Sequence, residues 1–183
     1  MNRIYIVEGL DRTGKSSLID KLRSKIKNPK IAMIHSSKPP KDVDQLVWAD
    51  QYYTNLILTA IQLHAQGFDV ILDRAWLGEY VYGTLYRGLY TSCKERIVES
   101  FEYIIKDPSV FKLVLLVDSP EALLARDDGL SFSSDLVSIK EERELFISAF
   151  NCSRIANKVM IDWQHHDFNT TLNKLVEQLT NDV

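Results

Sequence analysis

Residues 9–16 read Gly9-Leu10-Asp11-Arg12-Thr13-Gly14-Lys15-Ser16, which fits the pattern G-x-x-x-x-G-K-S. An apolar, strand-like stretch of residues 4–7 comes directly before this segment, and a helical pattern follows it. A glycine turn between a strand and a helix predicts a phosphate-binding loop, because its backbone N–H groups converge on phosphate oxygens. In such a loop the Lys15 ammonium reaches the β and γ phosphates, and the Ser16 hydroxyl ligates Mg²⁺. We therefore expect ATP and Mg²⁺ to bind here.

Strand-like and helical patterns alternate along all 183 residues. This alternation predicts one α/β domain over residues 1–183, a three-layer, doubly wound fold with a five-stranded parallel sheet. A serine-rich stretch, residues 130–138, predicts a mobile segment between two helices. The expected strands are 4–7, 31–34, 68–73, 112–118 and 159–161. The expected helices are one through Leu18, Leu22 and Ile26, then 44–66, one starting at Ser119, 140–157, and one through Leu172, Leu175, Val176 and Leu179.

Composition excludes several classes of protein. The 45% hydrophobic content is enough for one core, and the net charge of -3 gives no general attraction to nucleic acid or anionic membranes. No apolar run approaches the roughly 20 residues of a membrane span, and the first residues do not form a signal peptide. Cys93 and Cys152 lie far apart, without the spacing of a zinc or redox site. These features predict a soluble cytoplasmic protein that binds phosphate locally.

The surroundings of the loop favour phosphoryl transfer over guanine-nucleotide switching. A GTPase would need an N-K-x-D segment, but residues 157–160, Asn-Lys-Val-Met, end in methionine. Arg12 lies inside the loop, Arg74 follows the third expected strand, and Arg126 ends the helix before the serine-rich segment. Fixed guanidinium groups stabilise the negative charge of a phosphoryl-transfer transition state, and ligands gather at the carboxyl ends of parallel strands.

Three segments carry a family resemblance. Residues 7–17 read Val-Glu-Gly-Leu-Asp-Arg-Thr-Gly-Lys-Ser-Ser, Asp73-Arg74 follows a strand, and residues 116–121 read Leu-Val-Asp-Ser-Pro-Glu and lead to Arg126. In these segments the sequence resembles the thymidylate kinases, a family of P-loop nucleoside monophosphate kinases. The form Glu-Gly-x-Asp-Arg-x-Gly-Lys-Ser is more specific than a phosphate loop alone.

The resemblance implies roles for individual residues. Arg12 would bridge the donor and acceptor phosphates, Arg74 would clamp the acceptor phosphate, and Asp11 would meet the 3′ hydroxyl of the acceptor sugar. Asp73 would help to position Mg²⁺, and Tyr82 would lie near the sugar 2′ position, which favours deoxyribose. The implied catalytic residues are therefore Lys15, Arg12, Asp73 and Arg74, and the implied metal residues are Ser16 and Asp73.

The same resemblance implies that the serine-rich segment, at about residues 127–139, is a short lid that excludes water, and that Arg126 flanks the adenine or closes this lid. Trp48, Tyr52 and Tyr53 on the long helix are candidates for stacking on the acceptor base, with Trp48 and Tyr52 preferred, although helical spacing alone favours packing. Structural roles stay open for four residues: core packing for Tyr82, a strand-turn cap for Asp73, a structural or indirect supporting role for Asp118, and a solvated helix end that pairs with a neighbouring acid for Arg126. The implied nucleotide-binding residues are Gly9, Asp11, Thr13, Gly14, Lys15, Ser16, Ser17 and Arg126.

Two positions depart from the family pattern. Thymidylate kinases usually carry a base-reading arginine on the long helix, fourteen positions before its closing glycine, and counting back from Gly67 gives Tyr53. The lid has no arginine or lysine, so Arg12 has to supply the catalytic charge.

The resulting expectation is an Mg-dependent deoxynucleoside monophosphate kinase, acting on dTMP or a related deoxynucleotide. One alternative is a kinase for a hydroxyl of a free deoxynucleoside or of a modified base in DNA, with Glu8, Asp73 or Glu79 as general base. Another is a non-catalytic P-loop switch. The expected partners are small-molecule nucleotides, with nucleic acid disfavoured, no membrane, and a homodimer through residues 44–66 by analogy only.

Overall fold

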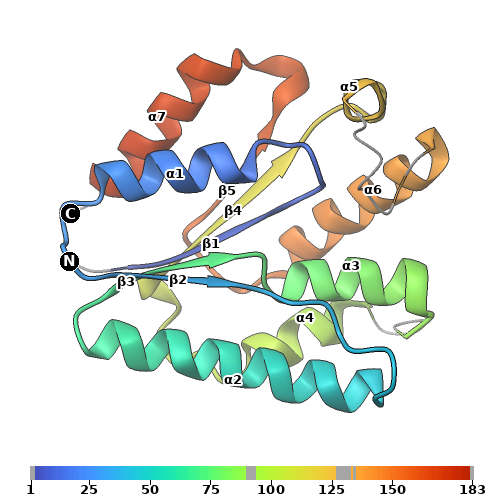
Figure 1. Cartoon of the computed structure of the whole chain (residues 1–183), viewed down its shortest axis with the longest axis horizontal. Helices are drawn as coiled ribbons and strands as arrows, with labels where there is room; N and C mark the ends of the chain where they lie inside the picture. The colour runs from blue at the N-terminus through green and yellow to red at the C-terminus, as the bar shows by residue number, and fades with distance from the viewer. Residues whose placement is uncertain (1–2, 90–93, 127–132, 134, 182–183) are drawn as a thin grey trace.

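The computed structural model describes residues 3–89, 94–126, 133 and 135–181. Five parallel strands form one sheet in the order β2-β3-β1-β4-β5 (Figure 1). The predicted parallel sheet with helices on both faces is therefore confirmed. The strands are β1 (Ile4–Gly9), β2 (Ile31–His35), β3 (Asp69–Asp73), β4 (Phe111–Val117) and β5 (Lys158–Asp162).

Helices cover the sheet on both sides (Figure 1). One side carries α1 and α7, and the other carries α2, α3, α4 and α6; each side has its own apolar cluster of buried residues. β1 and β4 are buried along their whole length, because they lie inside the sheet and are covered on both faces. The helices are α1 (Lys15–Lys25), α2 (Gln45–Ala65), α3 (Trp76–Arg87), α4 (Lys94–Glu102), α5 (Pro120–Ala125), α6 (Leu136–Cys152) and α7 (Phe168–Asn181).

Local signals in the sequence explain most helix ends. The Asp44 side chain accepts hydrogen bonds from two backbone N–H groups at the start of α2, and Gly67 follows that helix with a φ of 87°. The Ser119 hydroxyl accepts from the N–H of Ala122 at the start of α5. These three caps agree with the helix ends predicted from the sequence.

Two parts of the chain differ from the prediction. α6 was expected at residues 140–157 but begins at Leu136, because the Asp135 side chain accepts from two N–H groups of its first turn. Residues 136–139, assigned to the predicted lid, are therefore helical, while residues 127–132 and 134 of that lid lie outside the described residues. α3 and α4 were not predicted at all.

The carboxyl ends of β1 and β3 lie side by side, because the two strands pair in parallel with Val7 opposite Asp73. The N–H of Arg74 extends this pairing and donates to the carbonyl of Val7 at 3.0 Å. The phosphate loop and the Asp73-Arg74 pair thus meet at one edge of the sheet. Asp11 and Arg74, which touch there, are 63 residues apart in the sequence. In the described ranges, no helix combines the length and apolar character that crossing a membrane requires.

Candidate active site

The phosphate loop needs glycine at both of its ends. A Cβ on Gly9 would lie 2.1 Å from the carbonyl oxygen of Leu116 in β4, and Gly9 has a φ of 143°. Gly14, with a φ of 83°, precedes α1, and a Cβ there would lie 2.7 Å from the ring of Phe168. Only glycine fits such close approaches with left-handed backbone angles. The two fixed glycines of the sequence pattern therefore correspond to two steric requirements.

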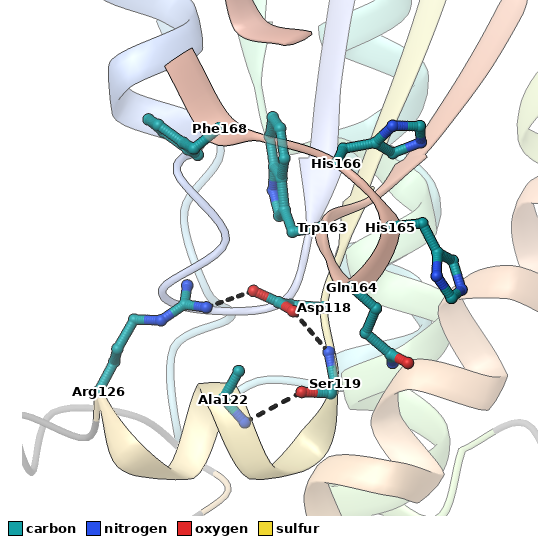
Figure 2. A pocket seen from close by; sticks show the side chains of 9 residues that line it. All are labelled: Asp118, Ser119, Ala122, Arg126, Trp163, Gln164, His165, His166 and Phe168. Carbon is teal, nitrogen blue, oxygen red and sulfur yellow. Dashed lines mark hydrogen bonds and ion pairs between the residues drawn. The ribbon is translucent and has the colours of Figure 1, made fainter. Parts of the chain in front are cut away.

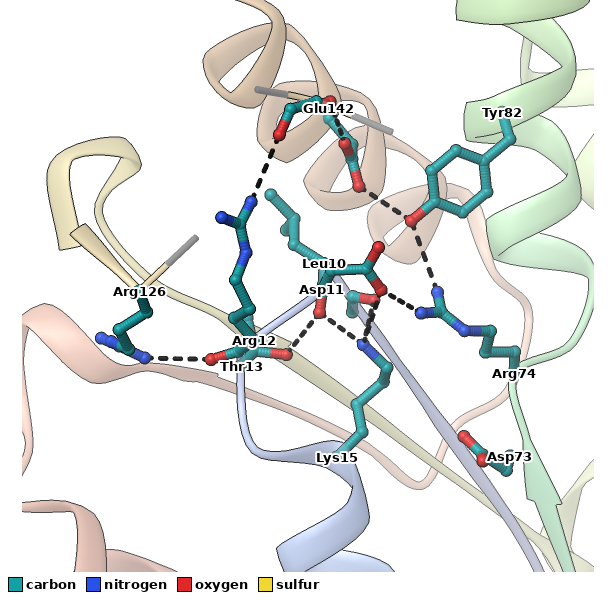
Figure 3. Close-up of polar contacts among 12 residues, drawn as sticks. Leu10, Asp11, Arg12, Thr13, Lys15, Asp73, Arg74, Tyr82, Arg126 and Glu142 are labelled. Carbon is teal, nitrogen blue, oxygen red and sulfur yellow. Dashed lines mark hydrogen bonds and ion pairs between the residues drawn. The ribbon is translucent and has the colours of Figure 1, made fainter. Parts of the chain in front are cut away.

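Lys15 is folded into the loop (Figure 3). Its Nζ donates to the carbonyl oxygen of Gly9 at 2.9 Å and to that of Leu10, and lies 3.9 Å from a carboxylate oxygen of Asp11. Burial, with a further contribution from the neighbouring Arg74 charge, lowers the pKa of Lys15 to about 8. A buried ammonium that is held mainly by carbonyl groups would be stabilised further by a phosphate anion.

Arg12 and Arg74 both adopt left-handed backbone conformations, each with a φ of 66°. Such angles are uncommon outside glycine and gather at functional sites. Arg12 projects from the loop and donates to the carbonyl of Ser133 at 3.3 Å, while its own carbonyl accepts from Arg126 at 3.0 Å. Arg74 forms an ion pair with Asp11 and donates to the Tyr82 hydroxyl at 3.4 Å. The structure thus brings both predicted arginines to the loop.

Glu142 joins these groups from α6, and the sequence analysis missed it. Its two carboxylate oxygens accept from the Tyr82 hydroxyl at 2.8 Å and from the Ser133 hydroxyl at 2.5 Å (Figure 3). Tyr82 contacts Arg74, and Ser133 contacts Arg12, so Glu142 orders both arginines indirectly. Burial raises the pKa of Glu142. A signal was present, because helical spacing places this residue on the apolar face of α6 with Ile139 and Phe146, where a carboxylate needs partners.

Glu8 lies beneath the loop and caps α3. Its Oε1 accepts from the N–H groups of Ala75, Leu77 and Gly78, at 2.8, 3.1 and 3.3 Å. Burial raises the pKa of this carboxyl group. Glu8 therefore fixes the start of α3, the helix that presents Glu79 and Tyr82.

Ser16 and Asp73 fit a hard divalent cation. Ser16 is exposed at the start of α1, and Asp73 ends β3 with one carboxylate oxygen 2.8 Å from Nδ1 of His35. Both offer oxygen ligands, as Mg²⁺ prefers. Within the described ranges, no group of three or more His, Cys, Asp or Glu side chains could hold a metal ion. A magnesium ion here would therefore depend on phosphate oxygens and water for most of its ligands.

A cavity of about 750 Å³, named here the α3 cavity, opens beside Arg74. It lies between α3, the phosphate loop and residues 35–45. Its lining includes the predicted site residues Asp11, Arg74 and Tyr82, together with Glu79, which was weighed as a general base, and Tyr53. The remaining lining residues are His35, Ser36, Ser37, Lys38, Pro39, Lys41, Gln45, Ala75, Gly78, Tyr86 and Arg87.

The structure does not bring Trp48 and Tyr52 to this cavity. Their rings stack on each other, with centroids 4.5 Å apart and planes 11° apart, and the Tyr52 hydroxyl accepts from the N–H of Ser37 at 2.9 Å. Tyr53 lines the cavity in their place. Adjacent residues on a helix point in different directions, and helical spacing alone cannot decide which of these three rings faces the cavity.

A second hollow of about 630 Å³, the Trp163 pocket, lies on the other side of the loop (Figure 2). Arg126 borders it and forms an ion pair with Asp118. The Trp163 indole N–H donates to the carbonyl of Thr13 at 2.8 Å and ties the pocket to the loop. The lining residues are Asp118, Ser119, Ala122, Arg126, Trp163, Gln164, His165, His166 and Phe168.

No family model and no curated protein sequence matches this chain. Solved structures do match in fold. The YorR protein of Bacillus subtilis, solved in complex with phosphorylated GDP, is 20% identical with a TM-score of 0.66, covering 96% of this chain and 95% of that chain. Thymidylate kinase from Candida albicans is 15% identical with a TM-score of 0.63, covering 99% and 92%. The chain therefore has a thymidylate kinase-like P-loop kinase fold.

Proposed function

We propose that this protein is a nucleoside monophosphate kinase that transfers the γ-phosphate of MgATP to the 5′ phosphate of a deoxynucleoside monophosphate, dTMP or a related one. The observation that carries the proposal is the Arg74–Asp11 ion pair, which joins the α3 cavity directly to the phosphate loop. A cationic clamp in one cavity and a phosphate loop beside it suit two phosphorylated substrates that react with each other. The similar solved structures, a thymidylate kinase and a protein with phosphorylated GDP, support a nucleotide kinase.

The donor nucleotide would occupy the phosphate loop and the Trp163 pocket. Loop N–H groups and Lys15 hold its phosphates, and Arg126 flanks its base at the border of the pocket. Ser16 and Asp73 would hold Mg²⁺, which neutralises charge on the transferred phosphate when bound. Arg12 extends from the same loop and would bridge donor and acceptor phosphates.

The acceptor would occupy the α3 cavity, with its phosphate against Arg74. A phosphate oxygen is already anionic at neutral pH, so its attack needs no strong general base, and catalysis comes from positioning and charge neutralisation. Asp11 would exchange part of its contact with Arg74 for the sugar 3′ hydroxyl. Tyr82, held by Glu142, would close the space near the 2′ position and so favour deoxyribose.

A hydroxyl kinase is the second candidate, and the carboxylates weigh against it. Such an enzyme needs a carboxylate that can take a proton from the hydroxyl. Glu8 caps α3, Glu79 is paired with Arg87 at 2.7 Å, and Asp73 contacts His35 at 2.8 Å. Glu79 and Asp73 are thus engaged by a neighbouring residue, and Glu8 is buried beneath the start of α3, with its Oε2 unpartnered among the described residues. The pairing of Glu79 and Asp73 favours a monophosphate acceptor.

Three further proposals have less support. A non-catalytic switch does not bind a second substrate, so the α3 cavity with its arginines favours an enzyme. The cytoplasm is the expected location, and a homodimer through α2 is expected by analogy only.

A panel of acceptors tests the proposed function. The protein would be mixed with MgATP and, separately, with deoxynucleoside monophosphates, free deoxynucleosides and single-stranded oligonucleotides, and ADP release would be followed. We expect ADP release in step with diphosphate formation from a monophosphate. Activity with only nucleosides or oligonucleotides would establish the hydroxyl kinase instead.

Replacing Arg74 with alanine should weaken acceptor binding more than it affects ATP binding. Losing a charge-assisted contact to the acceptor phosphate should raise the KM for the acceptor about 10- to 100-fold. Calorimetry with each substrate separately measures the two affinities. Arg23→Ala, at an exposed position of α1, removes the same side chain without touching the cavity and is the control. Equal losses of ATP and acceptor affinity in Arg74→Ala would contradict the assignment.

A further inference from the structure

Arg87 is the last residue of α3, and its side chain turns back along the helix into the α3 cavity. Its Nη2 donates to a carboxylate oxygen of Glu79 at 2.7 Å and to the Glu79 carbonyl at 3.5 Å. The Glu79 side chain is only 2% exposed and that of Arg87 is 15% exposed. A buried, charge-assisted pair of this kind holds the guanidinium plane in one orientation.

The other terminal nitrogen of this guanidinium, Nη1, lacks a partner among the described residues. Nη1 of Arg87 is buried and makes no hydrogen bond to any residue that the structure describes. Leaving a buried N–H donor unsatisfied is unfavourable, so each such group in a native protein calls for an explanation. Because Arg87 lines the α3 cavity, the simplest explanation is a ligand atom that accepts a hydrogen bond there.

The position of this donor separates it from the phosphate clamp. Arg74 precedes α3 and is joined to Asp11 of the phosphate loop, whereas the Arg87 guanidinium is held at Glu79, in the first turn of α3. A phosphate bound by Arg74 would leave the other end of the acceptor to meet the groups around Glu79. Tyr53 also lines the α3 cavity, and its hydroxyl lies 3.5 Å from that of Ser36.

We propose that Arg87, locked by Glu79, selects the acceptor base and binds a keto oxygen on it. This inference rests on the proposed function and names the class of acceptor. A guanidinium can only donate hydrogen bonds, so it suits the exocyclic oxygen of thymine, uracil or guanine. The amino group of cytosine or adenine at the same place is itself a donor, and it would leave Nη1 buried and unpaired. The protein therefore prefers keto-base over amino-base deoxynucleotides.

Binding measurements with four deoxynucleoside monophosphates test this inference. Calorimetry would give the affinities of dTMP, dGMP, dCMP and dAMP for the wild type, for Arg87→Met and for Arg87→Lys. We expect the wild type to bind its best keto-base ligand about 10- to 100-fold more tightly than its best amino-base ligand. Arg87→Met should reduce this ratio to about threefold or less. Arg154→Met, at an exposed position whose described hydrogen bond uses only backbone N–H, is the matched control.

Arg87→Lys covers the case in which Arg87→Met fails to fold, because it keeps a charge beside Glu79 but loses the planar fork. It should fold like the wild type and still lose most of the preference. An unchanged ratio in a folded Arg87 variant, a wild type without a keto preference, or no binding of any of the four ligands would each overturn the inference. Keto-selective binding without ADP release would instead remove the proposed function and leave the role of Arg87 intact.

Discussion

Replacing Lys15 with alanine should abolish phosphoryl transfer. The Lys15 ammonium is enclosed by the loop and lies where the β and γ phosphates of a bound nucleotide would be. Its pKa of about 8 leaves it mostly protonated at neutral pH, so the alanine variant loses a full positive charge next to the transferred group. We expect turnover to fall by at least about 10³-fold, together with a loss of ATP affinity.

Coupled measurement of ADP release and calorimetric titration with MgATP check both parts of this prediction. Lys25→Ala removes an exposed ammonium near the end of the same helix and should behave like the wild type. Thermal unfolding should show that the Lys15 variant is folded, because the variant removes a cation that burial disfavours. Turnover within tenfold of the wild type in a folded Lys15→Ala protein would mean that the loop does not hold the reacting phosphates.

The sequence predicted the sheet and the loop because both depend on local signals. Every strand is a short apolar run, and the phosphate loop is a contiguous motif whose glycines are required by close contacts at Gly9 and Gly14. Caps such as Asp44 and Ser119 act on N–H groups only two or three residues away. For these elements the residues that decide the structure are neighbours in the sequence.

α3 was missed because its decisive contact is not local. Residues 76–87 are rich in tyrosine, tryptophan and glycine, which are weak helix formers, so local propensity argues against a helix. The start of α3 has no cap from its own neighbouring side chain and depends on Glu8, which lies 67 residues before Ala75. The sequence shows only that a carboxylate, Glu8, lies within an apolar strand, and it does not identify the helix that Glu8 caps.

The site residues divide in the same way, into those that belong to local motifs and those whose contacts depend on how helices pack. Lys15, Arg12 and Arg74 could be proposed from the sequence because each lies in or beside a motif at the end of a strand. Glu142 and Arg87 were missed because their roles depend on which helix faces pack together, and Arg87 resembles any arginine at the end of a helix. For the same reason the sequence could not rank Tyr53, which lines the α3 cavity, above Trp48 and Tyr52.

Arg12→Ala should cut turnover by about 10³-fold with little loss of ATP affinity. Residues 127–139 contain no arginine or lysine, so no cation from that segment can replace Arg12 during transfer. Its guanidinium extends from the loop toward Ser133, away from the loop carbonyls that surround Lys15. Alanine has to adopt the same left-handed backbone angle as arginine, and the backbone contact with Arg126 is retained, so the loop should keep its shape.

Single-turnover kinetics with saturating MgATP and dTMP would isolate the transfer step, and calorimetry would report ATP affinity. Arg12→Lys, which keeps the charge without the planar fork, should recover only part of the rate. Near-normal transfer by Arg12→Ala would show that another group stabilises the transition state, and a matching loss of ATP affinity would assign Arg12 to ground-state binding alone.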